Sequence, residues 1–236
     1  MKRVSCCVLL LLTTSSSYAA DDGPPWLLVD TGLYPYQHDV KDDVDFTITT
    51  NAGMGRRLSY FSFVNFRGAV TDGNAVFDRS EQNLRWRISE KLPIDLNVQA
   101  IIVKGDGNDV TQLGIGWRID DTPAFRDFFD KLNLTYRLTW QFKRFDSGDN
   151  KGWQLEHFFR MTFPYVSDRL YLSGFVDHSF DRTLPDTIPD KPIVTEVQLG
   201  MRMFGRFYAL TEYRVNQFRV ADENNWVLGV EYKFRW

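Results

Sequence analysis

Asn225–Trp236 reads NWVLGVEYKFRW, and large apolar residues alternate along it with small or charged ones. Successive side chains of a strand point to opposite faces, so one face would carry Trp226, Leu228, Val230, Tyr232, Phe234 and Trp236. The other face would carry Val227, Gly229, Glu231, Lys233 and Arg235. A strand that ends the chain on an aromatic residue, with charges opposite an apolar face, is typical of the closing strand of a bacterial outer-membrane β-barrel. There the apolar face meets lipid and the charged face meets a wet lumen.

The beginning of the chain has the features of a secretory signal. Lys2 and Arg3 precede the apolar run Val8–Leu12, and Ser17-Tyr18-Ala19 is a small-x-small cleavage site. We predict a signal peptide over residues 1–19, cut after Ala19 or Ala20, and a single barrel domain over residues 20–236. The alternative is an N-terminal membrane helix, but such a helix needs roughly 20 apolar residues and this run is shorter.

The composition also fits an exported barrel. Cys6 and Cys7 both lie in the predicted signal, so the exported chain has no disulfide and no thiol chemistry. Charged residues make up 25% and mean hydropathy is −0.33, values that a barrel tolerates because only half of each strand faces lipid. The 15% aromatic content fits interfacial girdles. Loss of Lys2 and Arg3 takes the formal net charge from −3 to −5, and an acidic total argues against a nucleic-acid partner.

Strand-like segments recur along the whole mature chain, and we predict an all-β, antiparallel transmembrane barrel of about twelve strands with both termini periplasmic. Long polar links, such as Ala69–Gln82, alternate with tight turns, such as Gly55-Arg56, as in outer-membrane barrels. The predicted strands are Trp26–Leu33, Val44–Met54, Leu58–Gly68, Asn83–Ser89, Ile94–Val103, Thr111–Arg118, Leu132–Lys143, Trp153–Phe163, Leu170–His178, Val194–Met203, Phe207–Asn216 and Trp226–Trp236.

One predicted periplasmic link, Ile119–Lys131, is long and amphipathic. Thr122 before Pro123 resembles a helix N-cap followed by proline in the first turn. We predict a short interfacial or plug-like helix in this link. An irregular long turn is the alternative.

The strand faces opposite the apolar ones are too polar for a dry core, because a buried unpaired charge is costly. A soluble lipocalin-like barrel would have the reverse pattern, with apolar residues inside. The mixed signs predict ion pairs across the lumen rather than a filter of one sign. The predicted lumen holds Arg85, Arg87, Arg118, Arg137, Arg160, Arg202, Arg214, Lys233, Arg235, Asp95, Glu156, Asp177, Glu196, Glu212 and Glu231.

Leu58–Gly68 departs from the alternation, because it is apolar on both faces. If Tyr60, Val64 and Phe66 face lipid, then Phe61 and Phe63 face the lumen beside Asn65 and Arg67. Phe158 and Tyr208 also fall on lumen faces. These rings either fill a narrow barrel or form a stacking surface for flat ligands, since stacking of a base on an aromatic ring contributes roughly 1–3 kcal/mol.

The order of segments resembles that of the Tsx-type nucleoside-specific channel-forming proteins of Gram-negative outer membranes. The similar segments are Asp42–Asn65, Leu113–Asp120, Asp149–Asp177 and Val227–Phe234. The resemblance implies a barrel of about twelve strands with a narrow pore that carries aromatic residues and admits nucleosides. This chain differs from the family in being shorter, in its link Ile119–Lys131 and in its more highly charged lumen.

Our leading hypothesis is a non-enzymatic channel for passive diffusion of small solutes, with nucleosides as the class that the resemblance implies. The predicted pore and ligand-binding residues are Phe61, Phe63, Asn65, Arg85, Arg87, Arg137, Glu156, Phe158, Arg160, Tyr208, Glu212 and Arg214. A closed structural or adhesive barrel is the second hypothesis. The third, an outer-membrane hydrolase, lacks a plausible triad: Asp177, His178 and Ser179 are strand neighbours, and His157 falls on the lipid face.

We expect no cofactor and no resident metal. Asp39, Asp42, Asp43 and Asp45 form one Asp-rich stretch and Gly105–Asp109 forms another, but the Glu that an EF-hand loop needs is replaced by Trp117. Solvated loops are our interpretation of both stretches, with a surface Ca²⁺ bridging lipopolysaccharide as the alternative. The expected partners are outer-membrane lipids and lipopolysaccharide, the barrel-assembly machinery through the C-terminal strand, and a small solute.

Overall fold

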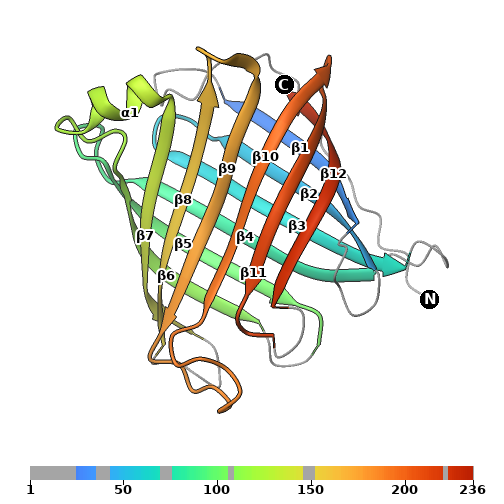
Figure 1. Ribbon diagram of the computed structural model, residues 1–236. Helices are drawn as coiled ribbons and strands as arrows, with labels where there is room; N and C mark the ends of the chain where they lie inside the picture. Colours follow the sequence, from blue (N-terminus) through green and yellow to red (C-terminus); the bar gives the residue numbers. More distant parts are fainter. Residues whose placement is uncertain are drawn as a thin grey trace, which may run out of the picture.

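A computed structural model of the chain describes residues 25–35, 43–69, 76–105, 109–145, 152–219 and 223–235. Twelve antiparallel strands in these residues form one closed barrel, in which β1 pairs with β12 as well as with β2 (Figure 1). The predicted fold class and strand number are confirmed. The strands are β1 (Trp26–Pro35), β2 (Asp43–Gly53), β3 (Leu58–Ala69), β4 (Val76–Arg87), β5 (Ile94–Val103), β6 (Val110–Arg118), β7 (Leu134–Arg144), β8 (Trp153–Phe163), β9 (Ser167–Phe180), β10 (Ile193–Phe204), β11 (Phe207–Asn216) and β12 (Asn224–Arg235).

The predicted bounds of β5, β8 and β11 are correct, and the largest error concerns β4. Asn83 is not the start of this strand, because pairing with β3 and β5 already includes Arg79 and Glu81. The error has a physical cause: between Asp78 and Gln82 both faces of the strand are polar, so the alternation that reveals a strand is lost. The predicted signal peptide, residues 36–42 with Asp39 and Asp42, and residues 106–108 lie outside the described residues.

The two ends of the barrel differ in their links. The chain enters β1 and leaves β12 at the same end, which also holds the short links after β2, β4, β8 and β10, and the helix α1 (Arg126–Leu132) after β6 (Figure 1). We call this the turn end, and we call the opposite one the loop end. The placement of the turn end in the periplasm stays a prediction.

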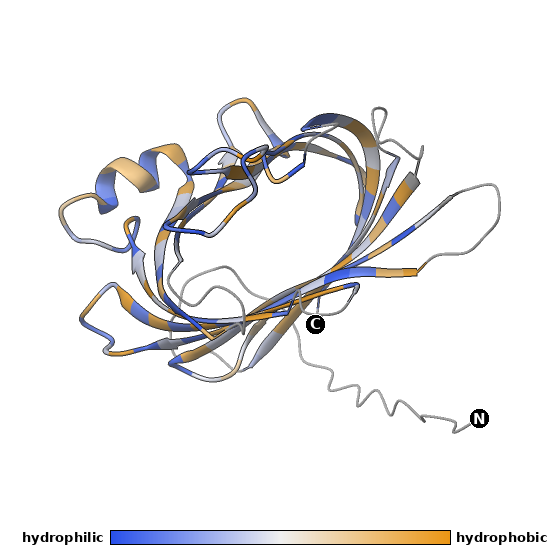
Figure 2. Cartoon of the chain, turned by 90° about the horizontal axis from the view of Figure 1, so that it is seen from below, coloured by the Kyte–Doolittle hydropathy of each residue, from blue (hydrophilic) through white to orange (hydrophobic). Residues whose placement is uncertain are grey.

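The predicted helix in the β6–β7 link is confirmed, but its predicted N-cap is wrong. The N-cap is Phe125, with no side-chain hydrogen bond. The Thr122 hydroxyl is engaged elsewhere, since Oγ1 accepts from Trp117 Nε1 at 2.8 Å and donates to the Arg118 carbonyl at 3.1 Å. The helix lies beside the barrel opening rather than across it (Figure 2), and its Phe129 ring approaches Tyr136 with centroids 6.1 Å apart. A plug-like helix is therefore excluded.

The barrel inverts the usual distribution of polarity. Asn83, Gln99, Gln112 and Gln141 are at most 1% exposed inside the barrel, whereas large apolar side chains such as Leu228, at 56%, are exposed on its outside. Hydrophilic and hydrophobic residues accordingly alternate along the strands (Figure 2). This pattern excludes a lipocalin-like arrangement, in which the apolar side chains point inward.

The closing strand has the predicted phase. Val227, Glu231 and Lys233 are buried inside the barrel, while Trp226 and Leu228 are exposed outside it. Among the described residues, no helix is long and apolar enough to cross a membrane.

Candidate channel lumen

A cavity of about 1210 Å³ lies inside the barrel. Its lining includes Arg56 and Arg126 at the turn end and Asn216 and Arg219 at the loop end. Residues at both ends of the barrel therefore border the same cavity.

Carboxylates gather in the part of the lumen nearer the loop end. Glu81 on β4, Glu156 on β8 and Asp177 on β9 all line the cavity, and they lie close enough to repel one another. Glu156 and Asp177 are register partners on neighbouring strands. We call these three residues the carboxylate layer.

Phenylalanines lie beside the carboxylate layer and at the next level toward the turn end. Phe158 and Phe175 are register partners on β8 and β9, one inward-facing step from Glu156 and Asp177. Phe61 and Phe63 lie on β3, with ring centroids 6.3 Å apart, and Phe63 pairs in register with Glu81. All four rings line the cavity. We call them the aromatic layer.

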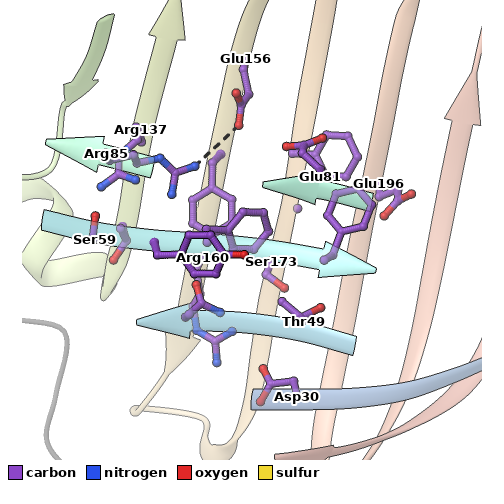
Figure 3. Close-up of a pocket in the computed structure, with 18 of the residues that line it drawn as sticks. Asp30, Thr49, Ser59, Glu81, Arg85, Arg137, Glu156, Arg160, Ser173 and Glu196 are labelled. Atoms are coloured by element: carbon purple, nitrogen blue, oxygen red, sulfur yellow. Dashed lines mark ion pairs between the residues drawn. The ribbon is translucent and has the colours of Figure 1, made fainter. Parts of the chain in front are cut away.

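Arginines follow, one further inward-facing step toward the turn end. Arg160 on β8 and Arg85 on β4 line the cavity at this level, and Arg137 on β7, the register partner of Phe158, lines it beside the aromatic layer. Figure 3 shows Arg85 and Arg137 on the opposite side from Glu81 and Glu196. The Arg85 guanidinium lies over the Phe61 ring at 5.6 Å. We call these three residues the guanidinium layer.

An ion pair crosses the lumen between β4 and β8, which are not neighbouring strands. Arg85 Nη2 lies 4.0 Å from Glu156 Oε1, and Figure 3 marks this pair with a dashed line. At this separation the contact is loose, because a direct charge-assisted hydrogen bond is about 2.7–2.9 Å long. The pair therefore narrows the lumen without locking it.

A network of amide side chains fixes the carboxylates to the wall between β4 and β8. Glu81 Oε1 accepts from Asn83 Nδ2 and from Gln99 Nε2, each at 2.8 Å, and Gln112 Nε2 donates to Gln99 Oε1 at 2.7 Å. Gln141 Nε2 donates to Glu156 Oε2 at 3.3 Å. These buried amide side chains fill the space next to the inner faces of these strands, so the open part of the lumen is displaced away from them.

The opposite side of the barrel is narrowed by two tyrosines. The buried Tyr171 hydroxyl on β9 donates to Glu231 Oε2 on β12 at 2.7 Å, and Lys233 Nζ lies 2.9 Å from the same oxygen. Gln198 Nε2 on β10 donates to the Tyr34 hydroxyl on β1 at 3.3 Å. These bonds join strands that are not neighbours, so they stiffen this side of the barrel.

Further charges are locked in pairs near the two ends. Toward the loop end Arg67 Nε donates to Asp45 Oδ1 at 2.8 Å. Toward the turn end Asp95 pairs with Arg118, and its other oxygen lies 3.6 Å from Arg137 Nη2. These pairs confirm the prediction of ion pairs between residues of mixed sign.

Asp120, in the link after β6, is partly buried, and burial changes the pKa of its carboxyl group. Its surroundings raise the pKa of the carboxyl above its ordinary value, although a backbone hydrogen bond to Tyr136 opposes the change. Asp120 lines the cavity at the turn end. Keeping the Asp120 carboxylate charged at this position therefore costs free energy.

Eleven of the twelve predicted pore residues line the cavity; Tyr208 does not. Tyr208 instead borders a smaller pocket toward the turn end, with its ring 5.8 Å from that of Tyr171, and Arg202 and Arg235 border the same pocket. The residues in the cavity are Phe61, Phe63, Asn65, Arg85, Arg87, Arg137, Glu156, Phe158, Arg160, Glu212 and Arg214.

The sequence interpretation missed Glu81, Arg79 and Asp45 as lumen residues. Glu81 and Arg79 fall in the part of β4 that it placed in a loop. Asp45, which it grouped with solvated loop aspartates, is 1% exposed and lies in β2. The signal that could have found Glu81 is its spacing from Arg85, which equals the spacing of Glu156 from Arg160.

The histidine that the hydrolase hypothesis would need faces outward, as predicted. His157 Nδ1 lies 2.7 Å from the Tyr136 hydroxyl, and His157 pairs in register with Val176, so it points away from Asp177 in the lumen. Within the described ranges, no group of three or more His, Cys, Asp or Glu side chains could hold a metal ion.

Comparison with known proteins gives structural neighbours but no sequence relatives. No family model matches the chain, and no curated protein matches it. A KdgM porin shares 13% identity with a TM-score of 0.53, over 88% of this chain and 99% of the porin. A NanC porin shares 9% identity with a TM-score of 0.54, over 88% of this chain and 100% of the porin. A KdgM porin in complex with disordered oligogalacturonate has a TM-score of 0.52 at 12% identity, over 88% of this chain and 99% of that one.

These neighbours define the fold. The chain is a closed barrel of twelve antiparallel strands that matches outer-membrane porin structures. At such low identity the likeness extends to the fold alone, and neither a family model nor a curated relative supports the predicted Tsx-type family.

Proposed function

We propose that the protein is an outer-membrane channel for passive diffusion of small polar solutes. The observation that carries this proposal is the cavity lined from both ends of a closed barrel. The exposed apolar side chains of β12, among them Trp226, Leu228 and Tyr232, would face lipid. The polar inner faces supply hydrogen-bonding groups that can replace part of a solute's hydration shell.

The test is conductance of the purified chain in a planar lipid bilayer. Discrete current steps in KCl support a channel. A barrel that inserts into the membrane but conducts no current would favour a closed structural or adhesive barrel. In that case the side chains on the two sides of the lumen would be in contact and would block the passage of ions. Proof of insertion, by protease protection in the same membranes, makes silence interpretable.

Nucleosides are a candidate solute class because three aromatic residues predicted to bind them line the cavity. Phe61, Phe63 and Phe158 offer ring faces within one lumen, and base–aromatic stacking contributes roughly 1–3 kcal/mol per base. Liposome swelling with a nucleoside and with a sugar of similar size tests this selectivity. Equal rates would remove nucleosides as a preferred class and leave the channel proposal intact.

An anionic oligosaccharide, such as the oligogalacturonate complexed with the KdgM porin, fits this lumen poorly. A polyanion that entered from the loop end would meet the carboxylate layer before it reached Arg85 and Arg160. We therefore expect slower passage of a uronate disaccharide than of a neutral disaccharide in the same swelling assay.

A further inference from the structure

Two strands of the barrel carry the same charge pattern in the same direction. On β4 the sequence Glu81-Gln82-Asn83-Leu84-Arg85 places a carboxylate and a guanidinium four residues apart, and on β8 Glu156-His157-Phe158-Phe159-Arg160 repeats that spacing. Both strands run from the loop end to the turn end, since both have even numbers in an up-and-down barrel. Each pair lies on one face and is separated by about 13 Å along its strand, at about 3.3 Å per residue.

The repeated pattern produces the order of the three layers. In both strands the carboxylate is nearer the loop end and the arginine nearer the turn end. Asp177, the register partner of Glu156, strengthens the carboxylate layer from β9. Along β4 and β8 the lumen therefore has opposite charges at two levels. Other charges line it as well: Arg79 Nη2 lies 3.2 Å from Glu81 Oε2 at the carboxylate level, and Asp95 and Asp120 line the turn end.

Three rings of the aromatic layer, those of Phe61, Phe158 and Phe175, lie between these charges, while Phe63 lies level with Glu81. Phe158 stands midway between Glu156 and Arg160 on β8, with Phe175 as its register partner. On the β3–β4 side, Phe61 pairs in register with Asn83, which is midway between Glu81 and Arg85. A solute that touched both charged layers would also touch the phenylalanine rings.

Several charged groups of the carboxylate and guanidinium layers have hydrogen-bonding atoms that no other described protein group satisfies. Asp177 Oδ1 and Arg85 Nε are buried atoms without a hydrogen-bond partner. Arg160 lies over the Tyr171 ring at 4.7 Å, and no described carboxylate forms an ion pair with it. A charged group in a narrow lumen needs water or a ligand, because an unsatisfied charge is costly.

We propose that the preferred solute is a zwitterion with an apolar middle, of the size of a short peptide. This proposal rests on the proposed channel function. The ammonium group would meet the carboxylate layer, the carboxylate group would meet the guanidinium layer, and an apolar side chain would contact the aromatic layer. A dipeptide or tripeptide spans about 7–11 Å when extended, at about 3.3–3.6 Å per residue. The distance between a carboxylate and a guanidinium in the two layers ranges from 4.0 Å, for Arg85 and Glu156 across the lumen, to roughly 13 Å, for the two charges of one strand. The length of the peptide falls within this range, so its two charged ends can reach both layers.

Other solute classes use only part of this arrangement. A nucleoside has no charge and would gain from the aromatic layer alone. An anion would gain from Arg85 and Arg160 and lose against Glu81, Glu156 and Asp177. A molecule with both charges meets an opposite charge at both levels along β4 and β8.

Swelling of liposomes that contain the purified chain tests the proposal. The probes are the tripeptide Gly-Phe-Gly, its N-acetyl form, its amide, the form blocked at both ends, and a nucleoside, all at pH 7. We expect the zwitterion to enter about fivefold faster than the doubly blocked peptide, the equivalent of about 1 kcal/mol for charge contacts that remain hydrated. A faster rate for the nucleoside or for a singly charged form would overturn the proposal.

Three variants locate the effect. Arg160→Gln and Asp177→Asn should each reduce the ratio of zwitterion to blocked peptide toward one. Lys104→Gln, an exposed change outside the cavity at the loop end, should leave the ratio unchanged. If all three behave alike, the layers do not select the solute.

Conductance in KCl, measured on the same preparations, separates the two proposals. Current steps with a ratio of one would overturn the zwitterion preference and keep the channel. Absence of current and of swelling, in a barrel shown to be inserted, would overturn the channel itself.

Discussion

The outward face of β12 offers a direct test that the barrel lies in lipid. Leu228 is 56% exposed in the middle of the strand, and Leu228→Arg would place a guanidinium where we expect hydrocarbon. An arginine on the lipid face of a membrane barrel costs about 2–4 kcal/mol at the bilayer midplane and about 0–1 kcal/mol near the interface. Asn224, on the same face of the same strand, is the matched control position.

The depth difference between the two positions follows from strand geometry. Four residues at about 3.3 Å each give about 13 Å along the strand, which a tilt of about 40° reduces to roughly 10 Å of depth. Since the apolar band of such barrels is about 25 Å tall, Asn224 lies near its edge when Leu228 lies near its centre. Asn224→Arg also loses the hydrogen bond from the Tyr213 hydroxyl, 2.9 Å long and exposed, which adds little to the cost.

The assay is equilibrium unfolding of the protein in lipid vesicles with a chemical denaturant. We expect Leu228→Arg to lower the free energy of unfolding by about 2–4 kcal/mol and Asn224→Arg by about 0–1 kcal/mol. Equal losses for both variants would refute the reasoning, because they would show that the outward face has no apolar centre.

Three further changes probe the interior and the turn end. Tyr171→Phe removes the hydroxyl that donates to the buried Glu231, and we expect a loss of about 1–3 kcal/mol in the same unfolding assay, whereas no loss would show that this bond across the barrel is not needed. Gly174→Ala would drive a methyl group into a backbone carbonyl of β10 and should cost about 1–3 kcal/mol, while Gly116→Ala, whose nearest neighbour atom would lie at 3.6 Å, should cost less; the reverse order would contradict the packing. Burial raises the pKa of Asp120, so the folded state binds its proton more tightly and this group's contribution to stability falls as pH rises from its unfolded pKa through its folded pKa. Asp120→Asn should therefore flatten stability against pH in that acidic window and stabilise the protein above it, and an unchanged pH profile would count against this assignment.

The face assignments could be predicted because strand alternation is a local property. Once Leu228 and Tyr232 are placed outside, Glu231 and Lys233 must lie inside, and the structure places them there. The same rule puts Phe61 and Phe63 in the lumen, although their strand is apolar on both faces. Alternation fails at the start of β4, where Ser80 and Glu81 are polar on opposite faces and the sequence resembles a loop.

Contacts across the lumen could not be predicted in the same way. The pairing of Arg85 with Glu156 and of Tyr171 with Glu231 joins strands that are not neighbours. Such contacts depend on the stagger and the cross-section of the closed barrel, which no single strand encodes. Tyr208 illustrates the limit: its face is predicted correctly, but Tyr171 and Lys233 lie against its ring and it does not reach the cavity.

The axial order of charges, by contrast, follows from local spacing combined with the strand number. A Glu and an Arg four residues apart share one face of any strand, because the side-chain period is two. Strands of even number all run toward the turn end, so Glu81–Arg85 and Glu156–Arg160 must have the same polarity wherever they lie around the barrel. Had one pair been on a strand of odd number, its charges would have opposed those of the other pair at each level. The charge separation that we propose to select zwitterions thus depends on the Glu-to-Arg spacing in each of the two strands and on the fact that both strands have even numbers. Neither the net charge nor the residue counts of the chain could reveal it.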